Sequence, residues 1–325
     1  MNLSELLTQY SQRPDQSVPD WMLGYFKRHS ISFADGKTDL LTNVCWLQSR
    51  NFTLDLRLPI STQQVKAKPW EDYSVEELLV MADYEGWEAL SEWDGELLKW
   101  CETENSLQLH NRWIEPGILE RFGNCMIELS PSGAYVEDWR LQPSRPGPLI
   151  GLRLIEERNV ETNEVCHKGG GLIICGDYAG IVLGRPQKIN ARQQYNALRA
   201  LVIEAQGNPK KLEEYFKFET SVAQGSITEG YKIILSTKPA RMGELLFSLD
   251  GFELISDESD KDSLGKQQLI KQKFYSQGEL HERIFVVDTL EKEINFEQTT
   301  GFTKQSQEWF EREEKTLTRY SHPLF

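Results

Sequence analysis

The sequence predicts a mainly β, antiparallel protein, and three observations carry this prediction. Short β-type runs recur every 8–12 residues or so, separated by Gly, Asp, Asn and Pro turn signals. The run Phe52–Leu58 alternates apolar and polar side chains, which is typical of a half-buried strand. Helical spacing is confined to a few short segments. Together these features favour a sandwich or barrel.

The predicted elements begin with a short amphipathic helix within residues 1–20, where Leu3, Leu6 and Leu7 share one face. Strands follow wherever β-type residues run between turn signals. In the first half they are Tyr25–Phe33, Asn43–Gln48, Phe52–Leu58, Leu78–Tyr84, Gly86–Trp93, Glu96–Glu102, Leu107–Trp113, Cys125–Leu129 and Ala134–Leu141. In the second half they are Leu149–Glu156, Gly171–Tyr178, Ile181–Gly184, Phe216–Ala223, Tyr231–Ser236, Glu244–Ser248, Leu269–Tyr275 and Arg283–Asp288.

Two later segments have helical character. In residues 191–206, Leu198, Leu201 and Val202 recur at helical spacing, and Gly207 follows as a stop signal. The tail, Thr303–Phe325, carries an aromatic pair among charged residues and is predicted as one further helix.

Short motifs recur in the same order in both halves, which predicts an internal duplication. Leu54–Leu58 is similar to Ile150–Leu154, and Ala82–Gly86 is similar to Gly176–Gly180. The Arg-to-Asp spacing is 26 positions in the first copy and 24 in the second. A meander of short strands can also produce such matches by chance. Two copies of seven to nine strands fit two small barrels, or one long sheet shared between the halves.

Several strand and turn motifs stand out: Val44–Gln48, Leu54–Pro59, Tyr135–Arg140, and the Asp-Tyr-x-Gly turns at Asp83 and Asp177. Together they resemble a family of tandem lipocalin-like proteins, the fungal kinase-interacting proteins and their bacterial relatives. The resemblance covers about residues 20–290 and implies two lipocalin-like antiparallel β-barrels in tandem with a few short helices. It implies no catalytic residues.

These considerations divide the chain into four parts. We expect an N-terminal helix and linker over residues 1–20, a first lipocalin-like barrel over 21–135, and a second over 136–292. The second barrel carries a helical insertion at 191–206. A C-terminal tail follows over 293–325.

Composition excludes several classes of protein. The 325 residues carry a formal charge of −14 and are 39% hydrophobic, so a sizeable core is expected and a nucleic-acid partner is not. No run approaches the roughly 20 apolar residues of a membrane span, and no secretory leader is visible. Five cysteines without a Cys-x-x-Cys pair indicate reduced thiols. We therefore expect a cytoplasmic protein.

The candidate ligand-binding residues lie in the first half, where eight of the nine tryptophans fall within 139 residues. Such rings can line an apolar cavity or simply fill a core. Trp46, Trp87 and Trp100 are the candidates of this kind.

Three polar residues complete the candidate site. Arg57 could hold a ligand carboxylate or phosphate, or it could pair with Asp55 on the same strand face. His110 and Arg112 share one strand face, which lies either in a barrel interior or in solvent. His110 can titrate near neutral pH and could act as an acid or base.

No established catalytic or cofactor motif is present, so no cofactor is expected. Cys166 and His167 are adjacent, and their side chains cannot point to one site on a strand. No metal site is therefore predicted.

Three functions remain open. The first is the binding of a small, largely apolar or amphipathic ligand in a barrel cavity. The second is a protein-interaction module with solid barrels and a protein partner. The third is an acid–base isomerase, lyase or hydrolase that uses His110 or an Asp-Tyr pair.

Overall fold

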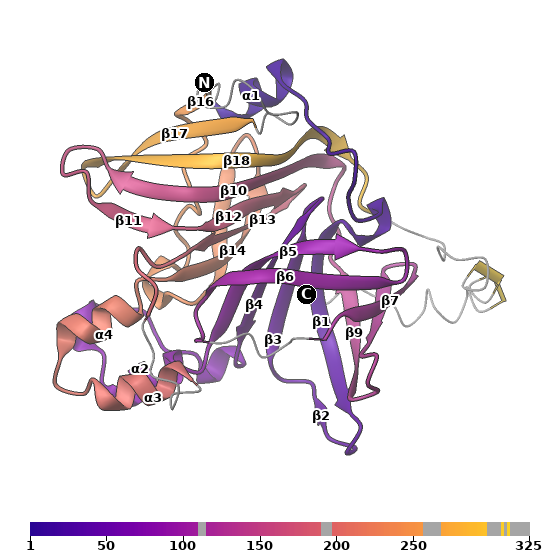
Figure 1. Ribbon diagram of the computed structural model, residues 1–325, viewed down its shortest axis with the longest axis horizontal. Helices are drawn as coiled ribbons and strands as arrows, with labels where there is room; N and C mark the ends of the chain where they lie inside the picture. The colour runs from indigo at the N-terminus through magenta and orange to yellow at the C-terminus, as the bar shows by residue number, and fades with distance from the viewer. Residues whose placement is uncertain (110–114, 190–196, 256–267, 298–306, 309–310, 313–325) are drawn as a thin grey trace.

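The computed structural model describes residues 1–109, 115–189, 197–255, 268–297, 307–308 and 311–312. These residues form two antiparallel sheets, which confirms the mainly β prediction. The α-helices named here are α1 (Leu3–Gln9), α2 (Val75–Met81), α3 (Leu198–Glu204) and α4 (Pro209–Tyr215). Short 3₁₀ turns occupy Asp20–Met22, Ser61–Gln63, Trp70–Asp72 and Pro239–Arg241. Figure 1 shows α2, α3 and α4 grouped together, far from α1.

The first sheet is a closed barrel of eight strands. Its strands are β1 (Gly24–Phe33), β3 (Asn43–Gln48), β4 (Phe52–Leu58), β5 (Glu85–Trp93), β6 (Leu97–Ser106), β7 (Gly117–Phe122), β8 (Cys125–Leu129) and β9 (Tyr135–Leu141), with β2 (Thr38–Asp39) added beside β1. Neighbours in this order pair, and β9 returns to β1 to close the ring. Because β9 completes the ring, the barrel extends past the predicted boundary at 135 to Leu141.

The strand β4 is buried on both faces, unlike the predicted half-buried strand. Its side chains Thr53, Asp55 and Arg57 lie inside the barrel. Its apolar side chains lie outside, where Phe52 and Leu54 contact the second sheet. The barrel therefore has a partly polar interior and an apolar outer face that the second sheet covers.

In the second sheet, as in the first, strands that follow each other along the chain lie side by side, and the last strand, β18, pairs with the first, β10. The second sheet is not closed within the described residues. Its strands are β10 (Gly147–Asn159), β11 (Val165–Lys168), β12 (Gly170–Cys175), β13 (Tyr178–Leu183), β14 (Glu219–Ser226), β15 (Gly230–Ser236), β16 (Phe252–Ile255), β17 (Leu269–Ser276) and β18 (Glu279–Ile294). Its order is β15-β14-β13-β12-β10-β18-β17-β16, and β11 pairs with β10. The edge strands β15 and β16 are not paired with each other within the described residues, so a second closed barrel is not observed.

The helix α1 covers the face of the second sheet that is turned away from the barrel. Leu3, Leu6 and Leu7 share a core with residues of β10, β12, β13 and β18. Asn2 and Glu5 form a capping box that starts the helix. The backbone N–H of Leu3 donates to the Leu249 carbonyl at 2.8 Å. The predicted helix is confirmed, and it supplies apolar side chains to the second half of the chain.

Glycines allow the two sheets to approach closely. A Cβ atom added at Gly86 on β5 would lie 2.4 Å from Thr220 Oγ1 on β14. A Cβ atom at Gly171 on β12 would lie 2.8 Å from the Phe52 ring. Because both distances are below van der Waals contact, a larger residue at either glycine would push the sheets apart.

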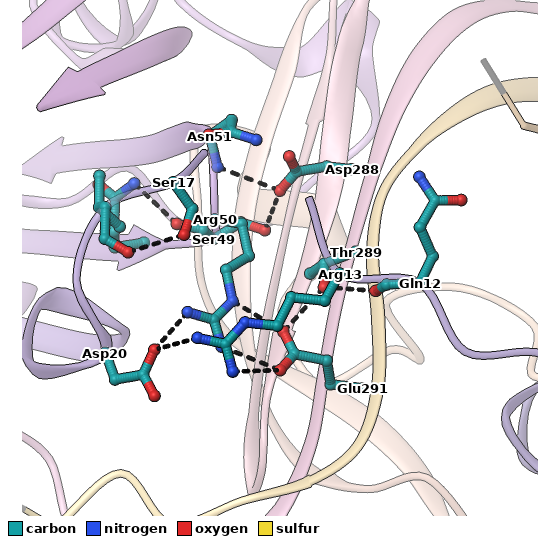
Figure 2. A network of polar contacts seen from close by, with 12 residues as sticks. Gln12, Arg13, Ser17, Asp20, Ser49, Arg50, Asn51, Asp288, Thr289 and Glu291 are labelled. Atoms are coloured by element: carbon teal, nitrogen blue, oxygen red, sulfur yellow. Dashed lines mark hydrogen bonds and ion pairs between the residues drawn. The ribbon is translucent and has the colours of Figure 1, made fainter. Parts of the chain in front are cut away.

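A polar network fixes the turn between β3 and β4 to β18 (Figure 2). Arg50 donates to both carboxylate oxygens of Glu291, at 2.8 Å from Nε and 2.9 Å from Nη2, and also to Asp20. On the other side of the turn, Ser49 Oγ donates to Asp288 at 2.6 Å. The Arg50 side chain is fully buried. The network therefore joins the barrel to the second sheet through a buried charge.

Two helices differ from the predicted elements. The predicted strand Leu78–Tyr84 is largely the helix α2, because Ser74 and Glu77 form a capping box at its start. The helix α4 begins with Asn208 as its cap and Pro209 in its first turn, a combination that favours helix initiation. The helix α3 lies within the predicted insertion at 191–206, and residues 190–196 lie outside the described residues.

The predicted residue matches between the halves do not occupy equivalent strands. Leu54–Leu58 lies on β4, whereas Ile150–Leu154 lies on β10, which has the place of β1 in the strand order. The two sheets therefore share a strand order, but the short motifs that match in sequence lie at different positions in that order. Most of the predicted tail helix lies outside the described residues. Among the described helices, none has the length and apolar character to cross a membrane.

Candidate functional site

Four tryptophan rings surround a small recess inside the barrel. Trp46 on β3 lies between Trp139 and Trp100, with ring centroids 5.3 and 6.0 Å away, and Trp87 lies 6.5 Å from Trp100. Side chains alternate between the two faces of a strand, and each of these rings lies on the face that points into the barrel. The recess has a volume of about 20 Å³, which is room for roughly one water molecule.

An ion pair lies at one side of this recess. Arg57 donates to both carboxylate oxygens of Asp55, at 2.8 and 3.1 Å, and both side chains are buried. Burial raises the pKa of Asp55 even with the guanidinium beside it. The same-face pair considered from the sequence is therefore present, but it lies inside the barrel. Asp55 already holds the guanidinium edge that a ligand carboxylate would use.

Burial favours the neutral form of one carboxyl group in the recess. Glu128 accepts hydrogen bonds from Tyr135 Oη at 3.1 Å and from Trp139 Nε1 at 3.0 Å. Burial, together with the charge of Glu137, raises the pKa of Glu128 well above its usual value. Glu128 and Glu137 lie opposite each other on β8 and β9. Glu137 accepts from Arg28 at 2.8 Å.

A larger cavity opens at the end of the barrel where β1 and β4 end and β5 begins. Its volume is about 580 Å³, within the range of small-molecule sites. The apolar part of its wall consists of Ile31, Phe33, Leu58, Pro59, Val80 and Tyr84. Val80 belongs to α2, so the connection between β4 and β5 forms part of the wall. Arg57 lines both this outer cavity and the recess.

The indole Nε1 atoms of Trp87 and Trp100 are buried and have no acceptor among the described residues. Both side chains line the recess. Trp87 as a whole is 7% exposed. A buried N–H group without a partner is costly, so two of them around one recess indicate a place for an acceptor atom.

The structure brings together four of the six predicted ligand-binding residues: Trp46, Arg57, Trp87 and Trp100 all line the recess. His110 and Arg112 lie outside the described residues. Whether any of the six binds a ligand stays a prediction.

The side chains of the predicted Asp-Tyr pairs bond to other groups, although Asp83 and Tyr84 line the outer cavity. Asp83 pairs with Arg199, and Tyr84 Oη accepts from the Val65 backbone at 2.9 Å. Asp177 pairs with Arg145 at 2.7 Å. These contacts favour a structural role for both turns.

Sequence reasoning missed the carboxyl groups of the site. Asp55, Glu128 and Glu137 were not among the candidates, although Asp55 and Glu137 each share a strand face with another recess residue. Glu137, for example, stands two positions before Trp139, and alternation sends both side chains inward. This alternation is the sequence feature from which the inward position of Glu137 could have been predicted.

Comparisons with known proteins add no family: no family model, no curated protein and no solved structure matches the chain.

Replacing Glu128 with glutamine is expected to raise the melting temperature at pH 8 and to flatten the pH dependence of stability. The pKa of Glu128 in the folded protein is above its usual value. Its contribution is therefore fully present below the ordinary carboxyl pKa and is lost as the pH rises toward the folded-state pKa. Glutamine has no proton to lose. Thermal unfolding between about pH 5 and pH 8 measures this difference.

The matched control is Glu76→Gln, a change at an exposed position on α2. It should leave the pH profile of the wild-type protein unchanged. A Glu128→Gln profile that parallels the wild type would contradict a neutral Glu128.

Proposed function

We propose that the first barrel binds a small, largely apolar and uncharged molecule that carries one hydrogen-bond acceptor, such as a ketone, aldehyde or lactone. The observation that carries this proposal is the pair of buried indole N–H groups of Trp87 and Trp100 at the recess, which shares Arg57 with the outer cavity. The acceptor oxygen would enter the recess, and the apolar body would fill the outer cavity.

The charges around the site support an uncharged ligand. Six carboxyl groups line the outer cavity or the recess together with Arg28 and Arg57: Asp39, Asp55, Asp83, Glu85, Glu128 and Glu137. Both arginines are held by these carboxylates, Arg57 by Asp55 and Arg28 by Asp39 and Glu137. An anionic ligand would therefore meet net negative charge. A cationic group would have no acceptor to offer the two indoles.

The sizes of the two cavities support the same arrangement. The recess of about 20 Å³ admits roughly one oxygen-sized group, so it selects the head group and not the body. The outer cavity of about 580 Å³ can take a ligand of about ten or more heavy atoms. The barrel interior itself is nearly filled, so the proposal places the body of the ligand in the outer cavity at the barrel end. The alternative is a protein-interaction module with solid barrels.

Three probes of equal chain length test the head group. Nonanone, nonanoate and nonylamine are each titrated against the protein, and tryptophan fluorescence reports binding. We expect nonanone to bind at least about tenfold more tightly than either charged probe, because burying an ion costs several kcal/mol. Tighter binding of nonanoate or nonylamine would contradict the proposal. Native mass spectrometry of the protein from its source would show the natural ligand.

Replacing Trp87 with phenylalanine is expected to weaken nonanone binding by roughly 5-fold. The ring stays, but one hydrogen bond of about 1 kcal/mol is lost. Calorimetric titration measures the change. The control is Trp70→Phe, since Trp70 lies in a 3₁₀ turn outside the barrel and should leave affinity unchanged. Equal losses in the two variants would place the ligand elsewhere.

The opposed carboxyl groups of Glu128 and Glu137 favour a second candidate, acid–base catalysis on the same ligand. Two facing carboxyl groups, of which burial favours the neutral form of one, can serve as acid and base. Proton exchange next to the nonanone carbonyl, followed in heavy water by NMR, tests this. Catalysis requires that the protein accelerates the exchange and that Glu128→Gln abolishes the acceleration while binding persists.

The common strand order of the two sheets supports a duplication of a lipocalin-like unit, in which the second copy has stayed open between β15 and β16. None of the five cysteines, all within the described residues, forms a disulfide. This supports the proposal of a reducing, cytoplasmic location.

A further inference from the structure

Three residues of different types converge on the second sheet, away from the first barrel. Glu157 on β10, Cys166 on β11 and His281 on β18 place one potential ligand atom each within 4.8 Å of the others. The three strands are neighbours, since β10 pairs with both β11 and β18. Figure 1 shows β11, β10 and β18 stacked in this way.

The distances between the ligand atoms suit a tetrahedral metal ion. His281 Nδ1 lies 3.3 Å from Glu157 Oε1 and 3.9 Å from Cys166 Sγ. Ligand atoms bound to zinc at its usual bond lengths lie about 3.3–3.8 Å apart in a tetrahedral arrangement. Small side-chain rotations would therefore bring all three atoms to bonding distance.

A neighbouring side chain orients one of the ligands. Arg283 Nε donates to Glu157 Oε2 at 2.6 Å, which leaves Oε1 turned toward His281. On the far side of the imidazole, Glu279 Oε2 lies 3.9 Å from His281 Nε2, beyond hydrogen-bond distance, and accepts from Asn159 Nδ2 at 2.7 Å. A shift of about 1 Å would let Glu279 accept from the imidazole, and a carboxylate in that position fixes the tautomer of a ligating histidine.

The charges and accessibility also suit a divalent cation. Two acidic side chains, Glu157 and Glu279, lie 3.3 and 3.9 Å from the two ring nitrogens of His281. Cys166 and His281 are partly exposed, which gives an ion a path from solvent. A thiolate, an imidazole and a carboxylate together favour zinc over magnesium or calcium.

We propose that Glu157, Cys166 and His281 form a binding site for Zn²⁺ or a similar transition-metal ion, with a fourth position open to water or another ligand. The site is independent of the function proposed for the barrel. Three protein ligands and an open position are the arrangement of catalytic zinc sites, whereas structural sites have four protein ligands.

Cobalt is the probe, because Co²⁺ takes the place of Zn²⁺ and absorbs visible light. The protein, kept reduced and freed of metal by a chelator, is titrated with Co²⁺. We expect a thiolate-to-cobalt charge-transfer band together with the visible bands of a four-coordinate ion. Added Zn²⁺ should remove both signals and raise the melting temperature. If no thiolate band appears, the proposal is wrong.

Ligand variants locate the ion. Cys166→Ser should abolish the charge-transfer band, and His281→Gln should weaken Zn²⁺ binding by at least about 100-fold, more than the loss of an outer partner. Two controls are Cys101→Ser, a cysteine of the first barrel, and His167→Gln, whose Nδ1 is occupied by the Gly184 carbonyl at 3.0 Å. Both should retain the wild-type spectrum. A band that survives in folded Cys166→Ser would overturn the assignment.

Discussion

Replacing Arg50 with methionine is expected to lower the free energy of unfolding by about 3–5 kcal/mol. The Arg50 side chain is fully buried, and Glu291 is only 12% exposed (Figure 2). Methionine leaves the Glu291 carboxylate without its bidentate partner, in a position that water reaches poorly. Urea denaturation measures the loss.

Arg13→Met is the matched control, because Arg13 contacts the same two acids but is 55% exposed. It should cost less than about 1 kcal/mol. The double variant Arg50→Met/Glu291→Met should recover part of the loss, since no carboxylate is then left buried and unpaired. Equal losses in the two single arginine variants would mean that burial of the charge does not matter here.

Replacing Leu6 with alanine is expected to cost about 2–5 kcal/mol. Leu6 is fully buried and belongs to the apolar core of the second sheet. The cavity left by alanine would open where α1 meets β16 and β18. Thermal unfolding of the variant measures the loss.

Gln9→Ala on the same helix is exposed and should change stability by less than about 0.5 kcal/mol. A similar small effect of Leu6→Ala would show that α1 does not stabilise the second sheet. A large effect of both changes would point to helix formation itself and not to the core contact.

Much of the strand pattern could be predicted because turn residues and short apolar runs mark it. The predicted bounds of β3, β4 and β8 agree with the structure. The strand predicted over Leu78–Tyr84 was wrong, because a short apolar run occurs in both strands and helices. The capping residues Ser74 and Glu77 just before it mark the start of a helix. The strand β7 was missed because Glu120 and Arg121 interrupt its apolar run. Arg121 lies inside the barrel, over the Phe26 ring at 5.2 Å.

The candidate site was predicted only in part, for a related reason. Aromatic residues could be assigned to a cavity from the crowding of tryptophans alone. On a strand that alternates apolar and polar residues, carboxyl groups are usually assigned to the face that contacts solvent. Here the second sheet covers the apolar outer face of β4, so the polar face of β4 turns inward. The direction in which the polar face of a strand points depends on which of its faces the second sheet covers. The sequence of the strand itself does not show this.

The three proposed zinc ligands could not be grouped from spacing. Cys166 and His281 are 115 positions apart and meet only because β18 returns to β10. Sequence reasoning considered Cys166 together with its neighbour His167, and in the structure the histidine is directed to Gly184 instead.

The position of α1 has a consequence for the order of folding. The leucines of α1 come almost 300 positions before Leu290 on β18, with which they share a core. Just after the helix, the Leu290 N–H donates to the Gln12 carbonyl at 2.8 Å. The barrel can close as soon as β9 has left the ribosome. The helix cannot dock until β18 has formed. We therefore expect a slow final folding phase, dominated by the closure of one very long loop, during which α1 and the outer face of the barrel stay exposed to chaperones.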